Sequence, residues 1–183
     1  MSKLKYNLSA AVIANQYVKS KMTIGASNKM RWDFPVAWQC SGSLINKGAM
    51  REQVDIDVLA ASKAAPKPKT RLQLTYQAQR IILEKSAAAA EQFGCGNCGE
   101  QSAIAFVYLR RQKTFPLDWM EVNDYKHAFV IIGRKRGSDT TDARTWGDEA
   151  VICDPWRDVV ATVRSEANYF STRKPNWIYA EIA

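Results

Sequence analysis

Cys98 stands between a glycine-rich loop, 94–97, and an apolar run, 103–109. The glycines end one helical pattern and a second pattern begins after them, so Cys98 is placed at the first turn of a buried helix. At that position the helix dipole and the free backbone N–H groups favour the thiolate over the thiol. The alternative is a flexible loop with buried cysteines, because cysteine is among the residues most often buried. Cys98 is therefore a candidate nucleophile that needs a base.

His127 and Asp154 are the residues that could activate this thiol. His127 is the single histidine of the chain and opens a β-prone run, and Asp154 closes the apolar run 150–154. If the two runs form neighbouring antiparallel strands, the start of one lies beside the end of the other. The carboxylate can then orient the imidazole, and the imidazole can accept the thiol proton. Asn123 and Asp124, close to the histidine in sequence, are rival candidates for the third position.

The segment 92–98, Gln-Phe-Gly-Cys-Gly-Asn-Cys, resembles the segment of papain-like cysteine hydrolases in which a glutamine precedes the nucleophilic cysteine by six positions. By that resemblance Cys98 is the nucleophile, and Gln92 donates to the oxyanion hole together with the backbone N–H of the nucleophile. A donor of this kind contributes roughly 10² to 10³ in rate. The Asp-Pro-Trp that begins at Asp154 is similar to the Asn-Ser-Trp of the family. The resemblance implies a papain-like core and a triad completed by His127.

Two departures from the family pattern point to a compact branch of the group. Gly99 follows Cys98, where the family usually has an aromatic residue. His127 lies only 29 positions beyond the nucleophile, whereas papain-type proteases separate the two by roughly 130 residues or more. The Gly-Asn-Cys-Gly-Glu segment at 96–100, with His-Ala-Phe-Val and Asp-Pro-Trp, looks more like compact bacterial toxin and effector domains of the papain-like and transglutaminase-like group. Several of these deamidate a glutamine of a target protein.

The resemblance thus implies a cysteine-dependent amidohydrolase that acts on protein substrates. Glutamine deamidation is the favoured reaction, and peptidase and transglutaminase reactions are the alternatives. It implies a bacterial toxin or effector that is made in the bacterial cytoplasm and secreted into a target cell by a specialised system. The segment 1–7 lacks the apolar core of a signal peptide. A neutralising or chaperone protein is an expected partner by analogy. The triad as drawn uses no cofactor and no metal.

Other interpretations of the cysteines stay open. Cys95 and Cys98 form a C-x-x-C pair at a helix start, the spacing of thiol-disulfide oxidoreductases, although no βαβ unit surrounds the pair. Cys95, Cys98, His127 and Cys153 are the ligand types of a zinc site, but the pattern lacks a second close pair. A non-enzymatic module with a basic surface is a further alternative. Cys95 lies close to the nucleophile in sequence, but no base or orienting acid is assigned to it. We therefore interpret Cys95 as a structural cysteine.

Composition limits the remaining classes. A chain of 183 residues suits a single domain, 1–183, with room for a core. The net charge of +8 suits an acidic partner, but lysines and arginines are scattered, so we expect no nucleic-acid binding. No apolar stretch is long enough for a transmembrane helix, and we expect no membrane span. Four cysteines are too few for a disulfide scaffold.

The predicted elements place helices first and strands after them. Helical patterns cover 4–20, 49–62, 70–90 and 98–111, and β-prone runs cover 127–133, 150–154, 159–163 and 177–182. This order predicts an α+β fold in which the helix that begins at Cys98 packs on an antiparallel sheet. The segment 64–69 is a stiff connection between a helical and irregular N-terminal region, 1–63, and the catalytic core, 70–183. We expect Trp32, Phe34 and Trp38 to pack in the core or cover the sheet, and a wall of a substrate cleft is the alternative.

Overall fold

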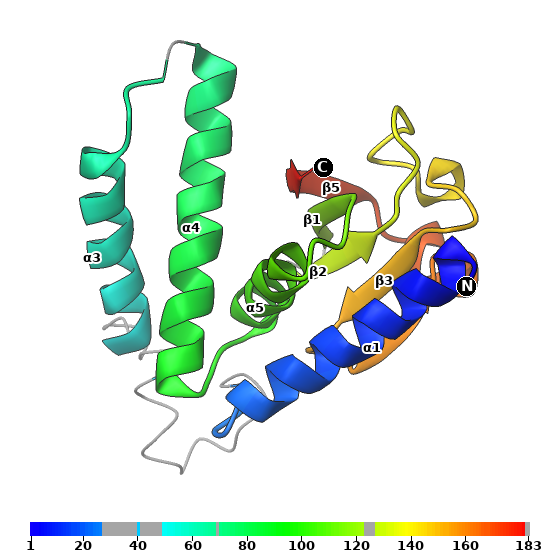
Figure 1. The fold of residues 1–183 in the computed structure, drawn as a ribbon, viewed down its shortest axis with the longest axis horizontal. Helices are drawn as coiled ribbons and strands as arrows, with labels where there is room; N and C mark the ends of the chain where they lie inside the picture. Colours follow the sequence, from blue (N-terminus) through cyan, green and yellow to red (C-terminus); the bar gives the residue numbers. More distant parts are fainter. Residues whose placement is uncertain (27–39, 41–48, 69, 123–126, 182–183) are drawn as a thin grey trace.

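The computed structural model describes residues 1–26, 40, 49–68, 70–122 and 127–181. The elements are α1 (Lys3–Lys21), α3 (Ala49–Ala64), α4 (Arg71–Phe93), α5 (Cys98–Arg111), β1 (Leu117–Val122), β2 (His127–Ile132), the 3-10 helix η3 (Ala143–Thr145), β3 (Val151–Asp154), β4 (Val159–Thr162), α6 (Ala167–Ser171) and β5 (Pro175–Glu181). The fold is α+β, as predicted (Figure 1). The predictions for Trp32, Phe34, Trp38, Asn123 and Asp124 fall outside the described residues.

The described strands form a five-stranded sheet in the order β4-β3-β2-β1-β5. Every neighbouring pair is antiparallel. All six residues of β2 are buried, as expected for a central strand that is covered on both faces. The strand β1 lies between β2 and β5 and was not predicted from the sequence.

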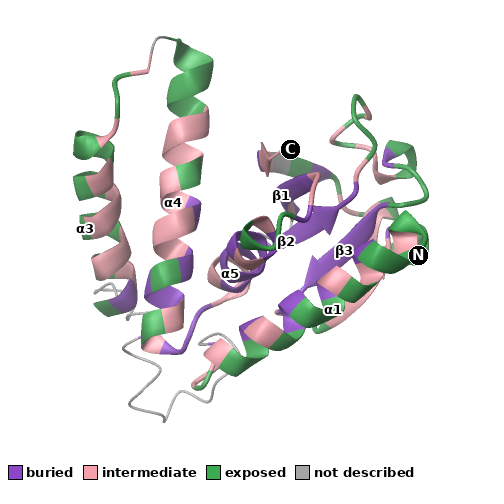
Figure 2. Ribbon diagram, viewed as in Figure 1, coloured by how far each residue is buried: buried purple, intermediate pink, exposed green. Residues whose placement is uncertain are grey.

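The helix α5 lies between α1 and α4 and packs on one face of the sheet (Figure 1). Eight of its residues are buried, among them Ile104, Phe106 and Leu109. They share one core cluster with Val130 of β2 and Val151 of β3. A helix that is apolar on nearly all sides is expected in the interior of a protein, and Figure 2 shows α5, β2 and β3 as its buried centre.

The N-terminal helix α1 belongs to this same core. Ala11, Ala14 and Val18 are fully buried in the cluster that contains α5, and the helix contacts β3 and β4. The side chain of Asn7 donates to the backbone oxygen of Glu149, 2.8 Å away, just before β3. The segment 64–69 therefore separates α3 from α4 but does not separate α1 from the sheet.

The helices α3 and α4 form a hairpin that stands away from the sheet (Figure 1). No described residue from 51 to 82 is buried, and α4 buries residues only in its second half, at Leu83, Ala87, Ala89 and Ala90. The hairpin is therefore buried against the core mainly through the second half of α4, and Tyr76 of α4 adds a ring contact with Tyr179 of β5 at 5.7 Å. No helix among the described residues is both long enough and apolar enough to cross a membrane.

Candidate active site

The loop before Cys98 is built to end one helix and begin another. Gly94 ends α4 in the left-handed region at φ 68°, where glycine avoids the steric penalty of a Cβ atom. Asn97 is the N-cap of α5, and its backbone N–H donates to the carboxylate of Glu100 at 2.8 Å. This half of a capping box, together with the negative charge in the first turn, stabilises the helix start. Cys98 is consequently the first residue of α5, as predicted.

The sheet brings His127 and Asp154 together. In the antiparallel pairing of β2 with β3, Val130 lies opposite Cys153, so in this register Asp154 lies opposite Phe129. His127 is two residues from Phe129 and points to the same face, which makes it the diagonal neighbour of Asp154. The Nε2 atom of His127 lies 2.6 Å from Oδ2 of Asp154. The start of β2 and the end of β3 therefore meet, as the sequence predicted.

Burial makes this contact strong. Asp154 is 0 % exposed and His127 is 6 % exposed, and a charge-assisted hydrogen bond gains strength where water is excluded. Because Nε2 is engaged with Asp154, Nδ1 is the ring nitrogen that remains for Cys98. A hydrogen bond joins the imidazole to the thiol of Cys98. The three residues thus form one continuous chain of contacts from sulfur to carboxylate.

The surroundings of Cys98 favour its thiolate. Burial alone raises the pKa of the thiol, but the hydrogen bond from His127, the backbone N–H groups of Ala128 and Gly99, and the charge of the imidazolium together lower the pKa below its usual value. Cys98 is half-buried rather than enclosed. A thiol that is accessible and has a lowered pKa is the typical state of a reactive cysteine.

The imidazole is tuned in the opposite direction. Burial lowers the pKa of His127, but the hydrogen bond to Asp154, the hydrogen bond to Cys98 and the charges of both partners raise it to about 9. A lowered thiol pKa beside a raised imidazole pKa favours transfer of the proton from the sulfur of Cys98 to His127. The thiolate and imidazolium that this transfer produces are the form in which a cysteine attacks a carbonyl carbon.

Arg157 also contacts the site and was not identified from the sequence. Its backbone N–H donates to Oδ1 of Asp154 at 3.1 Å, and its Nη1 atom lies 3.7 Å from Oδ2. Trp156 places its ring 5.2 Å from the ring of His127. Both residues follow Pro155 in the turn after β3. Arg157 could have been found from its spacing, because it lies three positions after Asp154. In a turn, this spacing lets the Asp154 side chain accept a hydrogen bond from the Arg157 backbone N–H.

Three hydrogen bonds fix the start of α5, and one of them comes from the sheet. The indole Nε1 of Trp119 donates to Oγ of Ser102 at 2.8 Å, and Ser102 donates to the backbone oxygen of Gly99 at 3.0 Å. The side chain of Gln101 donates to the backbone oxygen of Gly96 at 2.8 Å. The strand β1 thus helps to fix the position of Cys98.

Gln92 lies in the last turn of α4 and is exposed. Its side chain makes no hydrogen bond with another described residue, and its distance to Cys98 in sequence is the whole basis of its assignment. The structure brings together three of the four predicted site residues and leaves Gln92 outside this chain of contacts. Its role as oxyanion donor stays a prediction.

Cys95 forms a disulfide with Cys40. Cys95 and Cys98 therefore do not form the C-x-x-C pair that a thiol-disulfide oxidoreductase needs. The loop is held further by the segment after α1, because the backbone N–H of Ile24 donates to the oxygen of Gly94 at 2.8 Å and that of Gly96 donates to the oxygen of Gly25 at 3.2 Å. These contacts fix the loop in front of the nucleophile.

The zinc interpretation loses two of its four ligands. Cys95 is in a disulfide, and Cys153 is fully buried, with its Sγ atom 3.6 Å from the backbone oxygen of Ala11 on α1. Burial also raises the pKa of the Cys153 thiol, which opposes the thiolate that a metal requires. Within the described ranges, no three His, Cys, Asp or Glu residues gather as a metal site would require.

A scan against protein-family models finds no match to this chain, and a search of curated proteins finds none either. The interpretation of the site therefore rests on its residues and their geometry.

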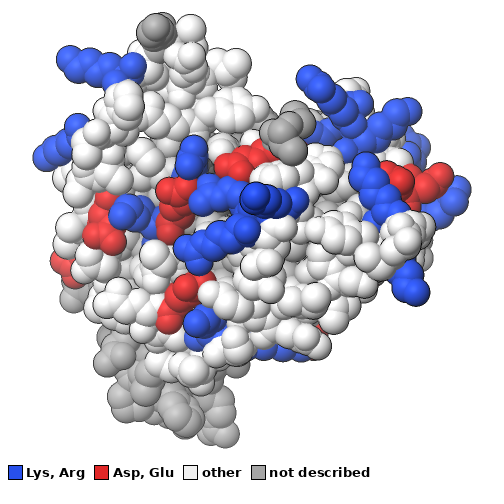
Figure 3. Space-filling view, in the orientation of Figure 1, with Lys and Arg blue, Asp and Glu red and all other residues white. Residues whose placement is uncertain are grey.

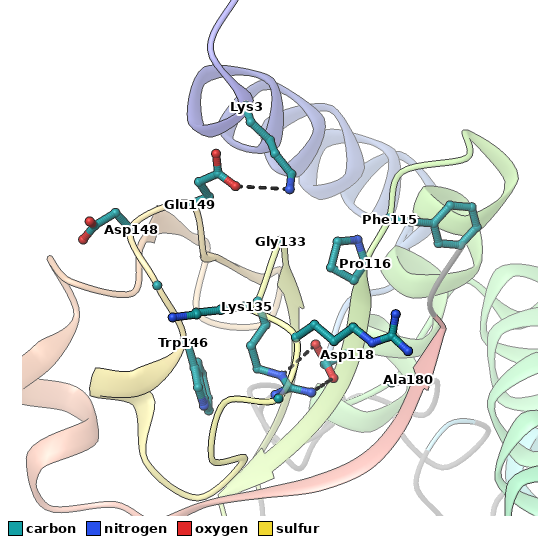
Figure 4. Close-up of a pocket in the computed structure, with 14 residues that line it drawn as sticks. Lys3, Phe115, Pro116, Asp118, Gly133, Lys135, Trp146, Asp148, Glu149 and Ala180 are labelled. Carbon is teal, nitrogen blue, oxygen red and sulfur yellow. Dashed lines mark hydrogen bonds and ion pairs between the residues drawn. The ribbon is translucent and has the colours of Figure 1, made fainter.

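A separate hollow of about 750 Å³ lies at the other end of β2, beside Gly133 (Figure 4). Two ion pairs lie in its lining: Arg134 binds the buried Asp118 through two hydrogen bonds, and Lys3 lies 3.1 Å from Glu149. On the face of the molecule drawn in Figure 3, acidic side chains lie among the basic ones. The hollow offers no reactive group comparable to Cys98.

Proposed function

We propose that the protein is a cysteine-dependent amidohydrolase that acts on protein substrates and that its reaction is the deamidation of a glutamine side chain. The observation that carries the proposal is the chain of contacts from the half-buried thiol of Cys98 through His127 to the buried carboxylate of Asp154. Each member comes from a different buried element, so the arrangement is fixed by the core rather than by a surface loop. The local likeness to papain-like hydrolases supports the same assignment.

The proposed reaction begins with attack of the Cys98 thiolate on the carboxamide carbon of the substrate. The C–S bond forms, and the carbonyl electron pair moves to oxygen, which becomes an oxyanion. The imidazolium of His127 then gives its proton to the amide nitrogen, ammonia leaves, and a thioester remains. Asp154 keeps the imidazole oriented and stabilises its charged form throughout.

Water completes the proposed cycle. Neutral His127 accepts a proton from the water that attacks the thioester, and the carboxylic acid leaves as the C–S bond breaks. The sum is an amide plus water giving an acid plus ammonia. A backbone amide in the same position would be cleaved, and an amine in place of water would be joined to the substrate. Peptidase and transglutaminase reactions are therefore the alternatives within this chemistry.

Intact mass spectrometry of candidate target proteins tests the proposal. Incubation with the protein is expected to produce the small mass gain of an amide converted to an acid, whereas a split chain means proteolysis and a joined pair means transglutamination. Cys98→Ala and His127→Ala should abolish the change, and Cys153→Ala is the matched control that should preserve it. Activity retained by Cys98→Ala would overturn the assignment of the nucleophile.

The proposal includes the role of a bacterial toxin or effector that works outside the cell that makes it, with a neutralising or chaperone protein as partner. The disulfide between Cys40 and Cys95 supports this part, because disulfides persist in oxidising compartments and are rare in a reducing cytoplasm. Labelling of the free thiols in protein recovered from the producing cell and from its medium tests it. When exported protein is denatured without reductant before labelling, only two labelled cysteines, Cys98 and Cys153, are expected.

A further inference from the structure

Arg157 links the candidate triad to the C-terminal part of the chain. Its Nη2 atom donates to a carboxylate oxygen of Glu166 at 3.1 Å, and its guanidinium carbon lies 3.9 Å from the ring centre of Tyr169. Glu166 is the N-cap of α6, and Tyr169 lies within it. Arg173 lies 4.5 Å from the same tyrosine ring. A short helix that buries none of its residues thus holds one arginine against the buried Asp154.

The guanidinium is divided between two carboxylates. Nη2 makes a full hydrogen bond to Glu166, whereas Nη1 is buried, lies 3.7 Å from Oδ2 of Asp154 and makes no hydrogen bond with a described residue. A separation of 3.7 Å is too long for a hydrogen bond but gives a direct electrostatic contact. Oδ2 is the same oxygen that accepts the hydrogen bond from His127. Arg157 and the imidazolium therefore compete for one carboxylate oxygen.

We propose that Arg157 is a positioning residue for the triad: its backbone N–H orients Asp154, and its guanidinium limits how strongly Asp154 holds the proton on His127. Negative and positive groups then alternate along a series of contacts that runs from the Cys98 thiolate through His127, Asp154 and Arg157 to Glu166.

This balance has a chemical purpose, which rests on the proposed function. The imidazolium must form easily, so that the thiol is ionised, but it must also release its proton to the departing ammonia. A buried carboxylate with no other cation nearby would stabilise the imidazolium so strongly that proton release slows. Glu166 draws the guanidinium away from Asp154 and thereby sets how much of its charge the carboxylate experiences.

The single histidine of the chain makes the proposal testable by one NMR signal. Arg157→Gln removes the competing cation but keeps the backbone N–H, so the pKa of His127 is expected to rise by roughly one unit. Arg157→Lys keeps the charge and should restore most of the wild-type value. Glu166→Gln frees the guanidinium to approach Asp154 and should lower the pKa of His127. Opposite signs from two neighbouring substitutions are not expected of a purely structural contact.

The controls separate this inference from the proposed function. Arg144→Gln removes an exposed arginine that pairs with Asp142 and should leave the titration unchanged. A His127 pKa that does not rise in Arg157→Gln, or that rises in Glu166→Gln, would overturn the role of Arg157 whatever the enzyme does. If the titration shifts as expected but no target protein is modified, the deamidase proposal fails while the role of Arg157 stands.

Discussion

Replacing Asp154 by Asn tests the central interaction of the candidate site. The pKa of His127 lies at about 9 rather than at 6.5, a difference that corresponds to about 3 kcal/mol in favour of the imidazolium. Burial acts against the charged ring, and the hydrogen bond to Asp154 is the largest cause that raises the pKa. Asn has nearly the same shape but no charge, so Asp154→Asn removes this stabilisation and leaves the burial in place. The pKa of His127 is expected to fall by about 1 to 3 units.

The measurement is an NMR titration of the imidazole, which gives one signal because the chain has one histidine. The same substitution should reduce the reactivity of Cys98 toward iodoacetamide at pH 6.5, because a thiolate without an imidazolium beside it is less stable. A charge-assisted hydrogen bond contributes about 1.5 to 3 kcal/mol, so the rate of alkylation is expected to fall about 10- to 100-fold. Cys153 is fully buried and should remain unlabelled in the folded protein.

Two control variants make the result specific. Asp142→Asn changes a carboxylate that pairs with the exposed Arg144 in the connection between β2 and β3 and should move neither the titration nor the alkylation rate. Cys98→Ala should lower the pKa of His127 by less than Asp154→Asn does, since the thiolate is the smaller of the two causes. If Asp154→Asn folds and its His127 still titrates near 9, the carboxylate does not hold the proton and the triad is wrong.

The remaining predictions concern pH and the loop before the nucleophile. Activity should fall as pH drops through the lowered pKa of Cys98, which protonates the thiolate, and should fall again as pH rises through about 9, where His127 loses its proton; a pH profile of kcat/KM checks both limbs. Cys95→Ala removes a disulfide that spans 55 residues and should lower the free energy of unfolding by about 2 to 4 kcal/mol in urea titrations without reductant, whereas a reduced wild type should show the same loss. Gly94→Ala should cost more than about 1 kcal/mol, because the residue has φ 68° and an added Cβ would meet the side chain of Thr23. Gly99→Ala, with open space at the Cβ position, is the matched control and should change thermal stability by about 0.5 kcal/mol or less.

Local sequence patterns were enough to predict the elements that carry the triad. Glycines followed by an apolar run placed Cys98 at the start of α5, and two apolar runs placed His127 and Asp154 at the ends of β2 and β3. The step from elements to proximity needed only one assumption, that the two strands are antiparallel neighbours. That assumption is simple because strands that follow one another in the chain are usually neighbours in a sheet.

The parts that escaped prediction depend on partners distant in sequence. The strand β1 contains Asp118, a residue that is uncommon in strands, and it is tolerated because Arg134 binds it at 3.0 and 2.8 Å. The disulfide of Cys95 reaches back 55 positions to Cys40. Neither the ion pair nor the disulfide has a signal in the neighbouring sequence. Taken by itself, the segment of β1 is a polar stretch, and Cys95 is an isolated cysteine.

The N-terminal helix shows how such distant contacts support the site. Asp158 ends the turn that carries Asp154 and Arg157, and it adopts the left-handed region at φ 61°, which costs a non-glycine residue free energy. Two residues of α1 hold it there: Asn15 donates to its carboxylate at 2.9 Å, and Lys19 lies 2.6 Å from the same oxygen. Because Asp158 directly follows Arg157, any movement of α1 would be transmitted to the turn that positions the carboxylate of the triad. A division of the chain at 64–69 would therefore separate the candidate site from one of the elements that hold it.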